Sequence, residues 1–113
     1  MARRRSVGWG YNVYKLLFHT DVEKQLARIP RAFAERLAGS IRALREEPRP
    51  SQAKHLDQEM YRLRQGEYRI VYAVFDQEQV VYIGKVARRA ENTYRDINRL
   101  LARARQAVKD TKD

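Results

Sequence analysis

The feature that most constrains this chain is an alternating pattern of residues on both sides of a short turn. Apolar and aromatic residues alternate with arginines in residues 60–64 and 68–75, around the turn Gln65-Gly66-Glu67. A period of two is typical of a strand with one buried face and one exposed face. These residues therefore predict a β-hairpin, and a third strand is expected from Val80 to Val86.

The arginines of this hairpin are expected on one face of the sheet. If Gly66 opens a two-residue type II′ turn, which needs a positive φ at that position, Arg64 lies opposite Arg69. Arg62 then lies opposite Val71, and the three guanidinium groups point to the same side. A three-residue turn would bury Arg69 among apolar helix residues, which is costly, so the two-residue turn is favoured. Guanidinium groups on a rigid sheet suit phosphate binding, because each offers paired donors and keeps its charge.

The remaining segments predict helices that are separate from this sheet. Residues 11–18 are strongly β-prone and predict a first strand. A helical apolar stripe ends at Pro30, a second helix is expected from there to about Glu47, and a last helix carries the stripe Ile97–Val108. The second helix is expected to bury four apolar residues: Phe33, Leu37, Ile41 and Leu44. The segment from Pro48 to Asp57 is expected to be a loop.

The resulting order, β-α-α-β-β-β-α, is typical of an α+β fold in which a small antiparallel sheet packs against an N-terminal helical hairpin. Two helices would cover one face of the sheet and leave the other face for the arginines. The chain of 113 residues suffices for one core. A single domain is therefore expected over residues 11–113, after a flexible basic arm over residues 1–10.

Composition narrows the kind of partner. The net charge is +10 and positive residues occur in every segment, which indicates an acidic partner such as nucleic acid, an acidic protein or an anionic membrane. The charge could instead serve only solubility. The chain has no cysteine, which excludes disulfides and thiolate metal sites and fits a reducing, cytoplasmic location. No apolar run has the length of a signal peptide or a membrane span, so no membrane partner is expected.

The usual catalytic sets are missing from the sequence. Neither His19 nor His55 has a neighbour at metal-ligand spacing, and there is no glycine-rich phosphate loop or cluster of carboxylates, so no metal or cofactor is expected. What remains is arginine and tyrosine chemistry on RNA, which carries its own nucleophile in the 2′-hydroxyl. Arginine can stabilise charge on a phosphate. Tyr94 can take a proton if nearby guanidinium groups favour its phenolate, although base stacking and ordinary packing remain open for it.

An ordered set of residues runs through the second half of the chain. It comprises Tyr68-Arg69-Ile70-Val71-Tyr72, the turn at Asp76, the strand Val80–Val86 and the tail Arg88-Arg89…Tyr94. This set resembles the RelE/ParE superfamily of bacterial toxins from type II toxin–antitoxin systems. The resemblance implies a compact α+β toxin of RelE-like fold that an antitoxin holds inactive. RelE-like members cut mRNA in the ribosomal A site without metal, whereas ParE-like members poison DNA gyrase.

Carried over position by position, the resemblance implies a set of site residues. The arginine of the Tyr-Arg strand matches Arg69. The basic residue past the last strand matches Arg88 or Arg89, and the tyrosine near the end of the chain matches Tyr94. The presence of this tyrosine favours RNA cleavage over gyrase poisoning.

The chain departs from the family on the first strand of the hairpin. RelE toxins carry lysines there, whereas these positions read Met60 and Arg62, with Arg64 further on. The change leaves phosphate binding intact, but it removes lysine as a proton-transfer group at these positions.

The first hypothesis is therefore a ribosome-dependent endoribonuclease. Its catalytic residues would be Arg62, Arg69, Arg88, Arg89 and Tyr94, and its RNA-binding residues would be Lys54 and Arg64. Tyr94 would act as general base for the 2′-hydroxyl, and cleavage would leave a 2′,3′-cyclic phosphate and a 5′-hydroxyl. The expected partners are mRNA, the ribosomal A site and a cognate acidic antitoxin, with no small-molecule cofactor. A ParE-like gyrase inhibitor without nuclease activity and a non-catalytic RNA-binding module are the alternatives.

Overall fold

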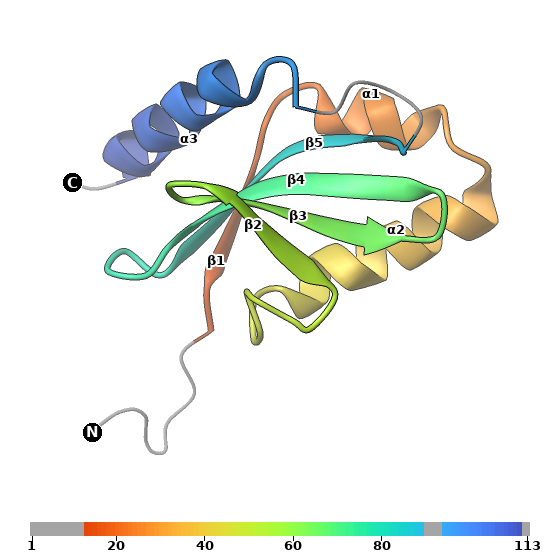
Figure 1. The fold of residues 1–113 in the computed structure, drawn as a ribbon, viewed down its shortest axis with the longest axis horizontal. Coiled ribbons are helices and arrows are strands. Elements are labelled where there is room, and N and C mark those ends of the chain that lie inside the picture. The colour runs from red at the N-terminus through yellow and green to blue at the C-terminus, as the bar shows by residue number, and fades with distance from the viewer. Residues whose placement is uncertain (1–12, 90–93, 112–113) are drawn as a thin grey trace.

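The computed structural model describes residues 13–89 and 94–111 (Figure 1). Within these residues the helices and strands have the following bounds: β1 Lys15–Phe18, α1 Val22–Ala27, α2 Arg31–Ala43, β2 Ala53–Asp57, β3 Met60–Gln65, β4 Tyr68–Phe75, β5 Val80–Arg88 and α3 Ile97–Thr111. The arm expected over residues 1–10 lies outside the described residues. None of the described helices has the length and apolar character needed to cross a bilayer.

The strands of the described ranges form one five-stranded sheet in the order β1-β5-β4-β3-β2. β3, β4 and β5 are antiparallel, as the sequence predicts. β1 instead pairs with β5 in parallel, so the first and last strands of the chain are neighbours and the sheet is mixed. The predicted α+β fold, with helices separate from a mostly antiparallel sheet, is confirmed.

Residues 53–57 form an edge strand, β2, at the end of the segment that was expected to be a loop. β2 pairs antiparallel with β3, so that Lys54 lies opposite Arg62 and His55 lies opposite Tyr61. The loop prediction was wrong for these residues because an edge strand is stabilised by a single neighbour. Its exposed positions can be polar, and the sequence then carries little β signal of its own.

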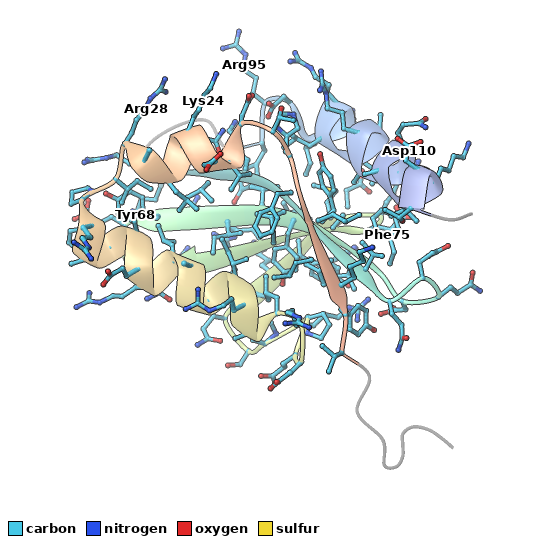
Figure 2. All side chains as sticks on the ribbon, turned by 180° about the vertical axis from the view of Figure 1, so that it is seen from behind. Lys24, Arg28, Tyr68, Phe75, Arg95 and Asp110 are labelled. Carbon is cyan, nitrogen blue, oxygen red and sulfur yellow. The ribbon has the colours of Figure 1, made fainter. Side chains whose placement is uncertain are left out.

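Helices cover both faces of the sheet. α1 and α2 lie across one face, which is the near side in Figure 2. The core on this face, called here the α1–α2 face, is formed by buried residues of the helices and the central strands: Val22, Leu37, Ile41, Ile70, Tyr72 and Ile83. α3 packs on the opposite face, called here the α3 face, through Leu100, Leu101, Ala104 and Val108. The sequence predicts that the second face is left to the arginines. This prediction was wrong in part, because α3 covers a portion of that face and the arginines occupy the rest.

The hairpin register agrees with the prediction. Arg64 pairs with Arg69 and Arg62 pairs with Val71. Gly66 has a φ of +59°, and the φ of Glu67 is not positive, which is the pattern of a type II′ turn. The turn therefore fixes which face of the sheet carries the arginines.

A second irregularity lies in β5. Val71 pairs with Lys85 while Tyr72 pairs with Ile83, so Gly84 is an extra residue in a β-bulge. A Cβ atom at Gly84 would lie 3.4 Å from the carbonyl oxygen of Val71 and 3.5 Å from Cδ1 of Leu100. The glycine therefore lets α3 approach the sheet closely at the bulge.

Candidate functional site

Four cations lie together on the part of the α3 face that the helix leaves open. These residues, called here the basic face, are Lys54, Arg62, Arg64 and Arg69. Directly paired residues of neighbouring strands share a face. Because Arg62 pairs with Val71, which packs under α3, the face carrying the arginines is the α3 face.

The strands that carry the basic face are held rigidly from the other side. Arg69 lies between Tyr68 and Ile70, which are both buried on the α1–α2 face. Arg62 similarly lies between Tyr61 and Leu63, and these two residues also pack on that face. Alternation along a strand thus fixes the direction of each guanidinium group through the burial of its neighbours.

Arg62 and Arg69 are half-buried, and each has a donor that is not satisfied. The Nε atoms of both side chains are shielded from solvent and have no hydrogen-bond acceptor among the described residues. Leaving a buried donor unpaired costs about 1–3 kcal/mol. Arg64, which is exposed, lies directly opposite Arg69, and like charges in that position repel. An anion bound over these strands would relieve both penalties, so the basic face has the chemistry of a phosphate site.

The two arginines at the end of β5 do not share one face. Arg88 pairs with Tyr68 and lies on the α1–α2 side, with its guanidinium carbon 5.9 Å from the centre of the Tyr68 ring. Arg89 is exposed, and its backbone N–H donates to the carbonyl of Glu67 at 2.7 Å. The structure thus separates Arg88 from the basic face by the thickness of the sheet, while Arg89 lies beside the hairpin turn.

Tyr94 lies just before α3. Its carbonyl accepts a hydrogen bond from the N–H of Ile97 at 3.3 Å, and its side chain is 38% exposed. The hydroxyl makes no hydrogen bond to any residue that the structure describes. Residues 90–93, which connect it to β5, lie outside the described ranges.

Neither histidine belongs to the basic face. His55 is on the opposite side of β2, where its Nε2 and the carbonyl oxygen of Gln58 are hydrogen-bonded at 2.7 Å and its ring packs on Tyr61. The Nδ1 atom of His19 accepts a hydrogen bond from the backbone N–H of Asp21 at 3.0 Å. In the described ranges, no three side chains of the kinds that bind metals converge on one point.

The sequence analysis missed one basic residue, Lys85. It lies opposite Val71 and so faces the same side as Arg62, and its Nζ contacts the carboxylate of Asp96 at 3.2 Å. Strict alternation from Tyr82 would have placed Lys85 on the α1–α2 face, but the bulge at Gly84 moves it to the α3 face. A glycine inside a strand pattern is a known sign of a bulge and was the available signal.

A second polar cluster, also missed, lies where the loop after α2 meets the β4–β5 turn. Arg49 donates to both carboxylate oxygens of Asp76, at 3.1 and 2.7 Å, and Tyr14 donates to the same carboxylate at 2.7 Å. The hydrogen bond from Arg49 holds the pKa of Asp76 below its usual value. Burial, followed by the bond to Asp76, raises the pKa of Tyr14 to about 12. These donors and acceptors are already paired, so the cluster joins two turns rather than offering a site.

The fold and the basic face together define a class of protein: a small α+β domain with an arginine-bearing sheet face bordered by a C-terminal helix. A family model described as the ParE toxin of the type II toxin–antitoxin system parDE matches residues 16–93. The chain therefore belongs to the RelE/ParE superfamily and is a type II toxin–antitoxin toxin, which confirms the resemblance found in the sequence.

Solved structures of RelE toxins are similar to the chain. RelE in the archaeal RelE–RelB complex of Pyrococcus horikoshii OT3 is 28% identical, with a TM-score of 0.62 over 70% of this chain and 98% of that chain. The intact E. coli RelBE complex gives 29% identity and a TM-score of 0.58 over 70% of this chain and 99% of that one. The isolated E. coli RelE toxin gives 24% identity and a TM-score of 0.60 over 80% and 98%. No curated protein matches the chain.

Proposed function

We propose that this toxin is a ribosome-dependent endoribonuclease that cleaves mRNA without a metal ion. The observation that supports it is the pair of half-buried arginines, Arg62 and Arg69, whose shielded Nε donors lack acceptors. Shielded donors without acceptors do not stabilise a folded protein, because buried polar groups are normally hydrogen-bonded. A phosphodiester supplies the acceptor oxygens that these groups lack, together with the opposite charge.

The proposed reaction uses the 2′-hydroxyl of the RNA as nucleophile. Arg62 and Arg69 bind the scissile phosphate and stabilise the charge that grows on its oxygens. Tyr94, as phenolate, takes the proton of the 2′-hydroxyl, whose oxygen bonds to phosphorus while the bond to the 5′-oxygen breaks. The 5′-oxygen takes up a proton from water and leaves as a 5′-hydroxyl, and the RNA keeps a 2′,3′-cyclic phosphate. Arginine cannot be the base because it stays protonated.

The other cations would bind the RNA on either side of the scissile phosphate. Arg64 and Lys54 are exposed and lie next to Arg69 and Arg62, which suits them to neighbouring phosphates. Of the two arginines that end β5, Arg89 is the one assigned a transition-state role here, because Arg88 lies on the α1–α2 side.

The same face offers a surface for the antitoxin. The similar toxins of P. horikoshii and E. coli were crystallised in complex with RelB antitoxins. We infer that an acidic antitoxin segment covers the basic face or displaces α3, since the chain carries a net charge of +10.

The test is primer extension on an mRNA incubated with the protein in the presence and in the absence of translating ribosomes. The wild-type protein is expected to give cuts only when ribosomes are present. Arg69→Ala should reduce cleavage by about a hundredfold or more, because one preorganised donor to the phosphate is lost. Arg31→Ala is the matched control, since it removes an exposed arginine on α2 whose side chain is 91% exposed. Absence of ribosome-dependent cuts by the wild type would contradict the proposal.

The second candidate is inhibition of DNA gyrase, which is favoured by the description of the matching family model as a ParE toxin. A supercoiling assay with purified gyrase separates the two candidates. Inhibition of supercoiling without any RNA cut would replace the first candidate by the second. Tight RNA binding with neither effect would instead identify a non-catalytic RNA-binding module.

A further inference from the structure

We propose that Lys85 is an additional phosphate-binding residue of this toxin, and that Asp96 is its internal counter-ion, which a phosphate of the bound RNA displaces. The inference rests on the proposed function, because it takes single-stranded RNA as the ligand. It adds Lys85, which is not one of the four residues of the basic face, and the carboxylate of Asp96, which directly precedes α3 and competes for the ammonium group.

The first argument is the position of Lys85 in the sheet. Lys54 pairs with Arg62, Arg62 pairs with Val71, and Val71 pairs with Lys85. These four residues form one row across β2, β3, β4 and β5 on the α3 face. Lys85 thus continues the basic face beyond Val71, and it lies diagonally across from Arg69, which pairs with Ala87 two residues further on.

The second argument is the state of the ion pair. The Nζ atom of Lys85 is 3.2 Å from one carboxylate oxygen of Asp96, and the two side chains are 20% and 28% exposed. A partly buried ion pair gives little net stabilisation, because removing both charges from water offsets their attraction. An ammonium has three donors, and a phosphodiester offers it a charged acceptor in place of the carboxylate. Exchange of one anion for the other is therefore feasible at this position.

The third argument is that the pair borders an accessible space. Lys85 and Asp96 line a cavity of about 220 Å³ between the end of β1, the start of α1 and the start of α3. The other charged or titratable groups that line it are His19, Asp21, Arg99 and Arg103. Three cations thus face two carboxylates, and the balance favours an anion. Three cations point into solvent along this edge in Figure 2: Lys24 on α1, Arg28 directly after α1, and Arg95 before α3.

The fourth argument is where Asp96 lies in the chain. It directly precedes α3, and its carbonyl accepts a hydrogen bond from the N–H of Leu100 at 3.0 Å. Leu100 packs on the bulge at Gly84, next to Lys85. The carboxylate is therefore held over Lys85 by the docking of α3, as a competitor for any phosphate that reaches the ammonium.

The experiment measures binding of a short single-stranded RNA, with 2′-O-methyl riboses so that it cannot be cut, by fluorescence anisotropy at several salt concentrations. Lys85→Met is expected to weaken binding about fivefold. It should also reduce the slope of log affinity against log salt by about 0.7, the value for one phosphate contact on a single strand. Asp96→Asn should tighten binding by a similar factor, because it removes the competing carboxylate. The double variant should bind as Lys85→Met does.

A purely structural role gives a different pattern. If the ion pair only attached α3 to the sheet, Lys85→Met and Asp96→Asn would act in the same direction and leave the salt slope unchanged, which would overturn the inference. Lys85→Arg keeps the charge and should keep both the affinity and the slope. A loss of affinity in Lys85→Arg equal to that in Lys85→Met would also overturn it, as would a wild type that does not bind the RNA at low salt.

This test is independent of cleavage. Opposite effects of Lys85→Met and Asp96→Asn on binding would support the inference even if translated mRNA stayed intact, in which case only the proposed nuclease activity would fail. Cleavage of translated mRNA together with parallel effects of the two variants would support the nuclease and refute the role of Lys85.

Discussion

Replacing Arg69 by methionine should abolish the activity of this toxin and yet make its folded state more stable. The Nε donor of Arg69 is shielded from solvent and unpaired, which costs about 1–3 kcal/mol. Repulsion from the directly opposite Arg64 adds less than about 1 kcal/mol. Methionine keeps most of the packing of the side-chain stem, so we expect a gain of about 1–2 kcal/mol in the free energy of unfolding. For a domain of this size, such a gain raises Tm by roughly 4–8 °C.

Arg64→Met is the matched control for this prediction. It removes the same like-charge pair, but its side chain is exposed and has no shielded unpaired donor. Its Tm should therefore change by less than about 2 °C, since surface substitutions usually stay within about 0.5 kcal/mol. The difference between the two variants should persist in about 1 M salt, which screens the repulsion but not the cost of the buried donor.

Thermal unfolding followed by circular dichroism measures the stability, and primer extension on translated mRNA measures the activity. Cleavage by Arg69→Met should fall at least about a hundredfold. A Tm for Arg69→Met below that of Arg64→Met would refute the reasoning. It would mean that the guanidinium of Arg69 already stabilises the free protein and is not reserved for a ligand.

Four further outcomes are expected. Tyr94→Phe should lower cleavage by about 10²–10⁴-fold with nearly unchanged ribosome affinity, and a loss of less than about threefold would make Tyr94 a stacking or packing residue. Because Arg49 lowers the pKa of Asp76, Asp76→Asn should destabilise the protein at neutral pH and progressively less below about pH 4; an equal effect in acid and neutral urea titrations would contradict this. The pKa of Tyr14 is raised to about 12, so the stability that it contributes should be lost between about pH 10 and pH 12. Burial also raises the pKa values of Tyr72 and Tyr82, so Tyr14→Phe should show a smaller loss than the wild type over this range rather than none. Added salt should change the association rate of the antitoxin more than its dissociation rate. An antitoxin that bound away from the basic face and left toxicity intact would contradict the inference that it covers this face.

The hairpin could be predicted from the sequence because two independent constraints agree on it. Gly66 permits the positive φ that a two-residue turn needs, and a three-residue turn would bury Arg69. Both constraints act within ten residues, and the observed pairing of Arg64 with Arg69 satisfies them together. The register of the hairpin arginines, and so the face of the sheet that carries them, could therefore be predicted from the sequence.

Features that depend on distant contacts could not be predicted in the same way. β2 is held by pairing with β3, and its own residues are mostly polar. Phe33 fits the helical stripe of α2, yet it is 45% exposed, because its ring meets that of Tyr68 only at a tilt, with the centres 6.0 Å apart, and lies under the guanidinium of Arg36 instead of being enclosed by the core. The direction of Lys85 depends on the bulge at Gly84, which in turn accommodates Leu100 of α3. Each of these outcomes is decided by a neighbour far away in sequence.

The division of the α3 face links the stability of this toxin to its proposed activity. The apolar residues of α3 cover Val71, Ala73 and Tyr82 and so complete the second core. Arg62 on β3 and Arg69 on β4 lie on the same face, and their shielded Nε donors lack acceptors among the described residues. The free protein thus retains a local concentration of positive charge that a bound anion would relieve. An RNA phosphate and an acidic antitoxin segment both carry the negative charge that would relieve it, so the two should compete for the same strands. Either one should raise the melting temperature of the toxin, by an amount that grows with the logarithm of its concentration divided by its Kd.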